Sequence, residues 1–418
     1  MRKHLCYFLF FYSAGICAQP DTVQKTIPGR KNSIEQQQKP YVILISADGF
    51  RYDYAEKHGA NNLIAFGKQG VKAEYMLPSY PALTFPNHYS IATGMYPSHH
   101  GLASNYFYSP RRKQFFSMKK EETVTDGSWY GGIPLWVLAE QQQMLSASFY
   151  WVGTEAAIKG IHPAYYYHYN EDIPVDRRIQ TVVNWLQLPP ERRPHLITFY
   201  VSQVDDAGHD YGPDAAATTV AVKWVDSVVQ KLYDAVVSTG LPVNFIFTAD
   251  HGMTRIDNIN TLPMPPAVDT AKFFIPRGFE MVELYAKNKR DIKPTYRKLK
   301  KQEKGFTAYL KARLPKHLHY GVKDDKMKVI GDILLIPDWP NTFNFSVTRP
   351  DPGAHGFDPV LVKDMRTVFY AWGPGVKNGI VVPPFENVNI YPVIARLLGL
   401  SYSHKIDGNA ELADRIVK

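Results

Sequence analysis

Three apolar segments, each rich in β-branched or aromatic residues and each ending in acidic residues or histidine, constrain the fold most strongly. They are YVILISADG at residues 41–49, LITFYVSQVDDAGH at 196–209 and VNFIFTADHG at 243–252. Continuous apolar runs bounded by turn residues are typical of strands that are covered on both faces of a sheet. Helical patterns alternate with them, at residues 86–94, 178–188 and 217–237. This alternation predicts an α/β fold with a largely parallel central sheet and helices on both of its faces.

Acidic and histidine side chains gather where these segments end. Ligands in open α/β sheets bind beyond the carboxyl ends of the strands, so these side chains are candidates for a functional site. Four of them are Asp48, Asp205, Asp250 and His251. His209 lies four residues after Asp205, a spacing that lets both face one point from a single helical turn. His355 lies in GAHGFD, where flanking glycines permit close approach of the backbone.

Taken one at a time, these residues have ordinary structural explanations. An aspartate after a strand is more often a turn or capping residue, and a lone histidine more often a hydrogen-bonded structural residue. We assign that structural role to His88, His99, His100, His162 and His195. The coincidence of three Asp and three His at glycine-bearing turns favours a shared metal site instead. Nitrogen and oxygen ligands without sulfur fit zinc in a hydrolytic site, with manganese or another divalent ion as the weaker alternative.

Thr84 is the candidate nucleophile, within the segment PSYPALTFPNHYSIATG. Pro86 at an early helical position and the apolar rhythm that follows it predict that Thr84 stands at the start of a helix. The segment alone favours a simple capping role for this threonine. The functional alternative is that the helix N-terminus stabilises a phosphoryl group on its oxygen, after a metal has lowered the pKa of the hydroxyl.

The first 18 residues, MRKHLCYFLFFYSAGICA, have the features of a secretory signal peptide cleaved near Ala18. Their apolar run is too short to span a bilayer comfortably, so no transmembrane segment is expected in the mature chain. Cleavage would remove Cys6 and Cys17 and leave metal binding to His and carboxylates. A lipoprotein that uses Cys17 is the alternative, which the bulky Ile16 disfavours. We therefore expect an exported protein, periplasmic or secreted.

The remaining sequence predicts one large domain. Residues 19–39 are polar and lack an apolar rhythm, which predicts a flexible tether before a domain at 40–418. The formal net charge is +9, and loss of Arg2 and Lys3 leaves +7, a balance that suits an anionic substrate. The densest basic run, at residues 287–304, is interpreted as a solvated helix face, since no nucleic-acid-binding motif accompanies it.

Seven motifs run in one order over nearly everything from Tyr41 to the C-terminus. They are SADGFR (46–51), PALTFPNHYSIATGMYPSHHG (81–101), YWVGTEA (150–156), WLQLPPERRPHLITFYVSQVDDAGHDYGP (185–213), ADHGM (249–253), GAHGFD (353–358) and PPFENVNIYPVIARLLGL (383–400). Together they resemble the nucleotide pyrophosphatase/phosphodiesterase family of the alkaline phosphatase superfamily. The resemblance implies an alkaline-phosphatase-like fold with inserted loops that form a lobe over the site. Cysteine-rich extra domains of animal relatives have no counterpart here, so it implies a catalytic domain alone.

The resemblance also implies two divalent metal ions and names the residues around them. One ion would be held by Asp205, His209 and His355, and the other by Asp48, Asp250 and His251, with Thr84 Oγ as the reacting ligand. Asn105 matches an asparagine that donates to a non-bridging phosphate oxygen. Three further residues match positions of a nucleoside-binding slot, with core packing as the alternative for the two aromatic ones: Phe85, Met118 and Tyr169.

The implied reaction is metal-dependent hydrolysis of phosphodiester or pyrophosphate bonds in nucleotides, which releases a nucleoside monophosphate through a covalent phosphothreonine. One alternative keeps the metal core but acts on a phospholipid headgroup diester, a phosphonate or a phosphomonoester. The other is a secreted binding protein without catalysis, which the complete set of ligands and nucleophile disfavours. Gln203-Val204, Val152 and Pro359 depart from the family pattern, and they bear on the substrate rather than on the metal ligands.

Overall fold

A nine-stranded sheet forms the centre of the computed structural model, which describes residues 22–276 and 278–418. Its strand order is β1-β8-β7-β9-β2-β10-β17-β3-β18, and all strands except β1 and β17 run in the same direction. The strands are β1 Lys25–Thr26, β2 Tyr41–Ala47, β3 Val71–Ala73, β7 Ser146–Phe149, β8 Tyr165–Tyr166, β9 Leu196–Val201, β10 Val243–Thr248, β17 Phe369–Trp372 and β18 Ile380–Val382. The prediction of a largely parallel sheet is confirmed.

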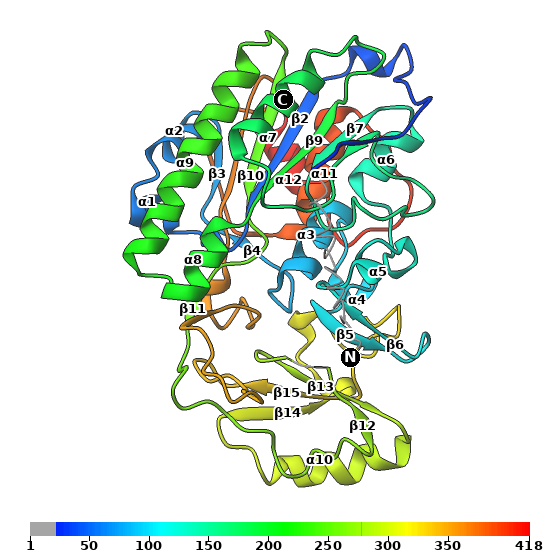
Figure 1. Ribbon diagram of the computed structural model, residues 1–418, viewed down its shortest axis with the longest axis vertical. Helices are drawn as coiled ribbons and strands as arrows, with labels where there is room; N and C mark the ends of the chain where they lie inside the picture. The colour runs from blue at the N-terminus through cyan, green and yellow to red at the C-terminus, as the bar shows by residue number, and fades with distance from the viewer. Residues whose placement is uncertain (1–21, 277) are drawn as a thin grey trace, which may run out of the picture.

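The central strands are largely apolar because helices cover both faces of the sheet (Figure 1). Along β2, Val42 and Leu44 join one core cluster, while Ile43 and Ile45 join the other. One face packs against α1 Tyr54–His58, α2 Asn61–Gln69, α7 Val175–Leu186 and α9 Ala216–Val237. The other face packs against α3 Thr84–Thr93, α6 Leu135–Gln141, α11 Ile390–Leu398 and α12 Glu411–Ile416. Successive residues of a strand point to opposite faces of the sheet, and here both faces are covered by apolar layers. The strands therefore do not show the alternation of apolar and polar residues that is usual for a half-exposed sheet.

The predicted elements differ from the observed ones mainly at their ends. The three predicted strands end earlier than expected, at Ala47, Val201 and Thr248. The end of the second predicted strand is a helix, α8 Gln203–Tyr211, which the spacing of Asp205 and His209 had indicated. Short elements complete this part of the chain: β4 Met76–Leu77, α4 Pro97–His100, β5 Tyr106–Ser109, β6 Gln114–Ser117, α5 Glu121–Val124, β11 Thr254–Arg255, β16 Gly353–Ala354 and β19 Phe385–Glu386.

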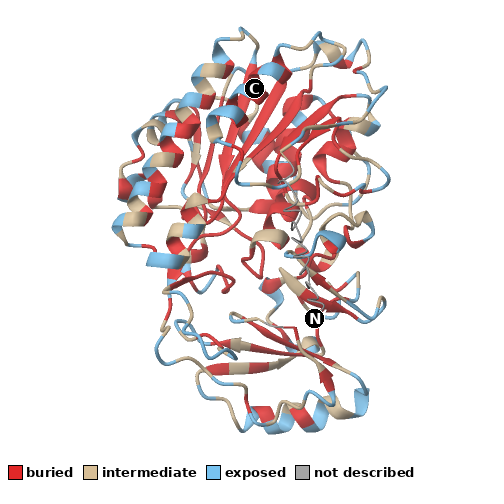
Figure 2. Cartoon of the chain, in the orientation of Figure 1, coloured by how far each residue is buried: buried red, intermediate tan, exposed pale blue. Residues whose placement is uncertain are grey.

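A separate lobe is inserted between β11 and β16 (lower part of Figure 1). It contains an antiparallel sheet in the order β12-β13-β15-β14 and a helix, with the bounds β12 Phe273–Phe274, β13 Val282–Ala286, α10 Ile292–Lys300, β14 Phe306–Leu310 and β15 Ile333–Pro337. Its core is a cluster of its own, in which Leu299 of α10 packs with side chains of the sheet. Figure 2 shows the buried strands of the lobe and the exposed outer side of α10. The lobe is therefore a folded unit rather than a set of loops.

The prediction of a flexible tether is wrong for residues 22–39. β1 pairs with β8, and Asn32 is buried, with its side chain bonded to the carbonyl oxygens of Pro190 and Arg193. Gln36 is also buried and donates to Gln142 O. Polar side chains hold this segment in place through hydrogen bonds to backbone groups of other segments. An ordered segment of this kind needs no apolar periodicity, so the sequence pattern did not predict it. The predicted signal peptide and its cysteines lie outside the described residues.

None of the helices in the described ranges is both long and apolar enough to cross a membrane.

Glu283 of β13 is a buried carboxyl in the lobe, and we expect it to make the stability of the protein pH-dependent. Burial raises its pKa from 4.5 to about 7, despite hydrogen bonds from Tyr285 and Gly331. Because the pKa of Glu283 is higher in the folded state than in the unfolded state, the folded protein favours the protonated carboxyl. The contribution of Glu283 to the free energy of unfolding is therefore complete below pH 4.5 and is lost as the pH rises through 7. Glu283→Gln should therefore raise the free energy of unfolding at pH 8 by up to about 3 kcal/mol and change it little at pH 5. Thermal melts at both pH values test this, and equal effects at both would contradict it.

Candidate metal centre

The carboxyl ends of three adjacent parallel strands bring the predicted ligands together. Asp48 follows β2, Asp205 lies on the helix after β9, and Asp250 follows β10, and these strands are neighbours in the sheet. His251 follows directly, and the chain then turns at Gly252, where a Cβ would lie 2.0 Å from Asp364 O. Only glycine fits at that position, and the turn lets two consecutive side chains reach one centre.

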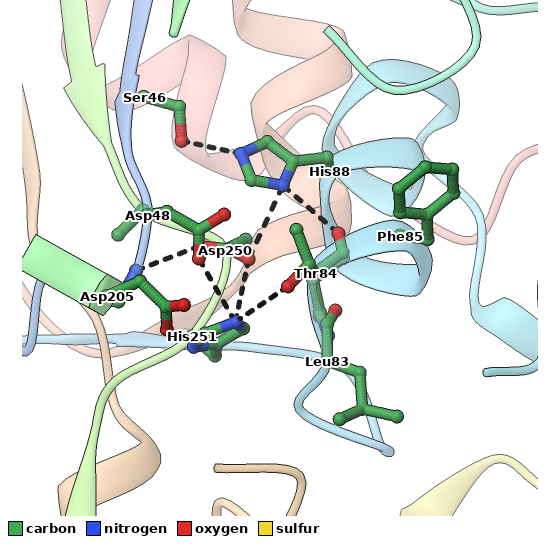
Figure 3. A network of polar contacts seen from close by, with 12 residues as sticks. Ser46, Asp48, Leu83, Thr84, Phe85, His88, Asp205, Asp250 and His251 are labelled. Atoms are coloured by element: carbon green, nitrogen blue, oxygen red, sulfur yellow. Dashed lines mark hydrogen bonds and ion pairs between the residues drawn. The ribbon is translucent and has the colours of Figure 1, made fainter. Parts of the chain in front are cut away.

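His251 stands at the middle of the cluster (Figure 3). Its Nε2 lies 3.2 Å from Asp48 Oδ1 and 3.0 Å from Asp250 Oδ2. Thr84 Oγ1 lies 3.3 Å from the same nitrogen. Ligand atoms of Asp48, Asp250 and His251 all fall within 4.8 Å of one another. This is the set that the resemblance assigns, together with the threonine oxygen, to one ion.

The second predicted set adjoins the first. Asp205 lies 3.5 Å from His209 Nε2 through Oδ2 and 3.7 Å from His355 Nε2 through Oδ1. The ring of His355 stacks on that of His251 with 3.5 Å between centroids, and ligand atoms of these two residues and Asp205 lie within 4.8 Å of one another. His209 stands at the edge, with its ring centroid 5.0 Å from that of His355. The structure thus brings all six predicted side chains and Thr84 into one place.

Backbone carbonyls orient all three histidine rings. The Nδ1 atoms of His209, His251 and His355 donate to the carbonyl oxygens of Gly353, Gly252 and Ala82, each at 2.9 Å. A histidine that donates through Nδ1 presents the lone pair of Nε2, the arrangement usual for metal ligands. Burial, together with the two neighbouring rings, lowers the pKa of His355 well below its ordinary value and keeps it neutral. The rings are therefore prepared to bind a cation.

The buried carboxylates lack a partner that a cation would supply. Within the described residues, no hydrogen-bond partner reaches Asp48 Oδ1, Asp205 Oδ1 or Asp250 Oδ2. Burial raises the pKa of Asp205 and of Asp250 to about 6, and burial together with Asp250 raises the pKa of Asp48 well above 3.8. Buried charges normally require pairing or a metal ion. Three carboxylates and three imidazoles form an oxygen and nitrogen donor set that fits divalent ions such as zinc.

Two residues, Tyr200 and His88, support the cluster from behind, and the sequence analysis placed neither of them beside it. Tyr200 of β9 donates to Asp48 Oδ2 at 2.6 Å. His88 lies one helical turn after Thr84, with Nδ1 3.0 Å from Thr84 O and 3.4 Å from Asp250 Oδ2, and its Nε2 contacts Ser46 Oγ at 2.9 Å. The hydrogen-bonded structural role predicted for His88 is thus observed, next to the site. Its spacing of four residues from Thr84 could have revealed this position.

Thr84 is the first residue of α3 rather than its cap. Leu83 occupies the capping position with extended backbone, and the hydroxyl of Thr84 is directed to His251. Asn105 lies beside the same helix start, and its Oδ1 accepts from Phe85 N at 2.9 Å. This bond orients the amide of Asn105 and leaves its Nδ2 without an acceptor among the described residues. The helix start therefore presents a hydroxyl and an amide donor together.

A cleft of about 350 Å³ opens beside Thr84. The three predicted slot residues, Phe85, Met118 and Tyr169, all line it. Tyr169 is 48% exposed and makes an edge contact with Tyr200, so core packing does not account for its ring. Further lining residues that were not predicted as slot residues are Lys119, Tyr150, Trp151, Val152, Glu155, Ser202 and Asp206. A flat, partly aromatic group of substrate size can enter this cleft with a phosphoryl group at Thr84.

The comparisons with known proteins agree in one family. The model of the type I phosphodiesterase / nucleotide pyrophosphatase family matches residues 42–358. The human ectonucleotide pyrophosphatase/phosphodiesterase family member 1 is 35% identical over 382 residues, which cover 87% of this chain and 40% of that protein. The venom phosphodiesterase of Macrovipera lebetinus is 34% identical over 373 residues, which cover 86% of this chain and 43% of the relative. The chain thus spans about two fifths of the length of these curated relatives.

Solved structures agree on the fold. Human ectonucleotide pyrophosphatase/phosphodiesterase 5 superposes with a TM-score of 0.83 at 24% identity, covering 90% of this chain and 99% of that one. An inactive variant of the murine protein, solved in complex with AMP, superposes with a TM-score of 0.83 at 24% identity and covers 90% of this chain and 100% of that one. The fold is therefore alkaline-phosphatase-like, as expected. By the family match and by its relatives, this chain belongs to the type I phosphodiesterase / nucleotide pyrophosphatase family of enzymes.

Proposed function

We propose that the protein hydrolyses phosphodiester or pyrophosphate bonds in nucleotides and releases a nucleoside monophosphate. The observation that carries this proposal is that the Thr84 hydroxyl and six buried or half-buried candidate ligand residues lie together, and that Thr84, Asp48 and Asp205 line the cleft. Relatives named as nucleotide pyrophosphatases and phosphodiesterases support it, as does the AMP complex of the murine relative.

Two divalent ions, in our proposal zinc, would be held by the chain. Asp205, His209 and His355 would hold one, and Asp48, Asp250 and His251 the other. Bound there, the ions would lower the pKa of the Thr84 hydroxyl and balance negative charge on the attacking and leaving oxygens. The orphaned carboxylate oxygens and the orientation of the three rings support this division.

The chain's own residues define the two steps. Thr84 Oγ1 passes its proton to solvent and attacks phosphorus. A threonine–phosphorus ester forms as the bond to the leaving oxygen breaks, and that oxygen departs as an anion that solvent can protonate. Water then attacks phosphorus from the opposite side, restores the threonine hydroxyl and releases the monophosphate. Asn105 Nδ2 donates to a non-bridging oxygen, where negative charge develops, and its bond to Phe85 N fixes the direction of that donor.

The nucleoside would lie in the cleft, with its base against Phe85, Met118 and Tyr169. Stacking of a base on an aromatic ring contributes about 1–3 kcal/mol. Tyr169→Ala should therefore raise KM for a nitrophenyl nucleotide diester by roughly tenfold or more, with a smaller change in kcat. A methyl nitrophenyl phosphate diester has no aromatic group besides its leaving group and serves as the control substrate. A KM that rises equally for both substrates would show that Tyr169 does not contact the base.

A substrate panel tests the activity itself. We expect kcat/KM for a nitrophenyl nucleotide diester to exceed that for nitrophenyl phosphate and for a nitrophenyl phosphocholine ester. Among the described residues that line the cleft, Lys119 is the only basic one, so the cleft lacks the cluster of cations that would favour a dianionic monoester. A preference for the monoester would overturn the substrate assignment, and a preference for the phosphocholine ester would select the headgroup alternative.

We also propose that the chain is exported, with cleavage near Ala18, to the periplasm or the medium. Relatives named as ectonucleotide enzymes and as venom enzymes support export. N-terminal sequencing of the exported protein should begin near Gln19, and a retained N-terminus would contradict the proposal.

A further inference from the structure

One segment of the lobe carries a net positive charge equal to that of the whole chain after residue 18. Residues 287–304 contain nine Lys or Arg and two acidic residues, which gives this segment a net charge of +7. The rest of the chain after residue 18 contains 37 basic and 37 acidic residues and is balanced. The entire excess of the chain after residue 18 therefore lies in 18 consecutive residues. We call the nine exposed cations the α10 basic surface: Lys287, Lys289, Arg290, Lys293, Arg297, Lys298, Lys300, Lys301 and Lys304.

The apolar side of α10 is already occupied. Thr295 and Leu299 are buried, and Ile292 and Tyr296 pack against the core of the lobe. The helix therefore cannot turn over to insert an apolar face into a membrane or a partner. Its opposite side carries three exposed cations in one row at spacings of four residues, at positions 293, 297 and 301. Contact through this side is electrostatic.

The three cations of this row repel one another. Like charges four residues apart on a helix destabilise it by about 0.2–0.5 kcal/mol per pair. Of the nine cations, only Lys300 forms an ion pair with a described residue, namely Glu303. Elsewhere on the surface an exposed lysine can have an acidic partner from a distant segment, as Lys231 has in Asp176. An anionic surface that meets the row would relieve the repulsion.

The position of α10 favours a flat partner over a polymer that enters the active site. The helix lies along the outer edge of the lobe, at the end of the molecule away from the nine-stranded sheet (Figure 1). A flat surface can approach the cations without obstruction from the larger domain. Single-stranded nucleic acids usually bind through exposed aromatic side chains beside the cations, and no large hydrophobic side chain of residues 287–304 is among the exposed ones.

We propose that the α10 basic surface docks the protein on an anionic phospholipid bilayer. Clusters of four to eight Lys or Arg on a helix are typical of segments that bind anionic lipid, and each cation near the surface contributes about 1 kcal/mol. Adsorption would hold the enzyme at the membrane with its catalytic cleft on the larger domain facing the solution. Binding would depend on salt, because exposed charges are screened beyond a Debye length of about 10 Å at 0.1 M.

Vesicle sedimentation of the full chain tests the proposal. The protein should bind vesicles of phosphatidylcholine and phosphatidylglycerol, should not bind pure phosphatidylcholine, and should be released by salt. Reversing three charges in Lys293→Glu, Arg297→Glu and Lys301→Glu should lower the partition coefficient about 100-fold or more. The matched control reverses three exposed lysines of the larger domain and should bind like the wild type; these are Lys68, Lys223 and Lys405.

Two further measurements separate the alternatives. A conservative variant, Lys293→Arg with Arg297→Lys and Lys301→Arg, should retain vesicle binding because every charge of the row is kept. Hydrolysis of a soluble nitrophenyl nucleotide should be unchanged in every variant, which shows that each is folded. Three results would each overturn the proposal: equal loss of binding in the control triple, no vesicle binding by the wild type, or binding of an oligonucleotide in place of vesicles.

Discussion

Thr84→Ala should lower kcat on the order of 10⁵-fold while the metal content stays that of the wild type. The hydroxyl would supply the atom that attacks phosphorus, and within the described residues no other hydroxyl is hydrogen-bonded to His251 Nε2. The six residues that we propose as ligands are untouched, so the ions should still bind. Steady-state kinetics on a nitrophenyl nucleotide diester, with metal analysis of the same sample, checks both parts.

Thr84→Ser is the matched control, because it keeps a hydroxyl at the start of α3 and removes only a methyl group. It should retain most of the activity that the alanine variant loses. Rapid quenching of the wild type should trap a phosphorylated chain, and the alanine variant should yield none. Full turnover by Thr84→Ala would end the proposed covalent mechanism.

Metal removal should have an effect of similar size. Dialysis against a chelator should abolish hydrolysis, and two equivalents of a divalent ion per chain should restore it. The metal-free protein should also be less stable, because an ion present at about 1,000 times its Kd contributes about 4 kcal/mol. Differential scanning calorimetry with and without ions measures this loss. Chelation that leaves both activity and stability unchanged would exclude a metal role for the cluster.

The same loss of stability on metal removal should grow between pH 5 and pH 8. Without ions, Asp205 and Asp250 have pKa values of about 6, above the ordinary 3.8. Their contribution to stability is therefore complete below pH 3.8 and is lost as the pH rises through 6. The pH dependence that Glu283 contributes is the same in the metal-loaded and the metal-free protein. The difference between their free energies of unfolding therefore reports only on Asp205, Asp250 and the other residues of the cluster. A difference that is the same at both pH values would contradict this origin.

The sequence could predict the strands, and the clustering of the candidate ligand residues, because both depend on local signals. A run such as residues 243–248 is nearly continuous in apolar residues since helices cover both faces of the sheet, and Asp250 and His251 come soon after it. Parallel neighbours then place their carboxyl ends at one edge. The spacing paired Asp205 with His209, and the resemblance supplied the rest of the division between two ions. The observed atoms in fact place His251 within reach of both sets.

Other features could not be predicted because they depend on contacts between distant residues. Residues 22–39 are held by side chains such as Asn32, whose partners lie more than 100 residues away. Tyr200 reaches Asp48 only because β9 and β2 are neighbours. The strands of the lobe lie between basic and polar stretches, and Glu283 interrupts the apolar pattern of β13 from within the core.

The insertion of the lobe between His251 and His355 has a consequence for how the chain folds. Closing a loop of roughly 100 residues costs about 4 kcal/mol in chain entropy. The antiparallel ladder of β11 and β16 joins the two ends of the insertion beside the stacked rings. If the lobe folds around its own core first, it brings β11 and β16 close together. Most of the entropic cost of closing the loop is then no longer required when the centre assembles. Lengthening its outer loops should then slow assembly of the centre only slightly, since each doubling of loop length adds about 0.6 kcal/mol.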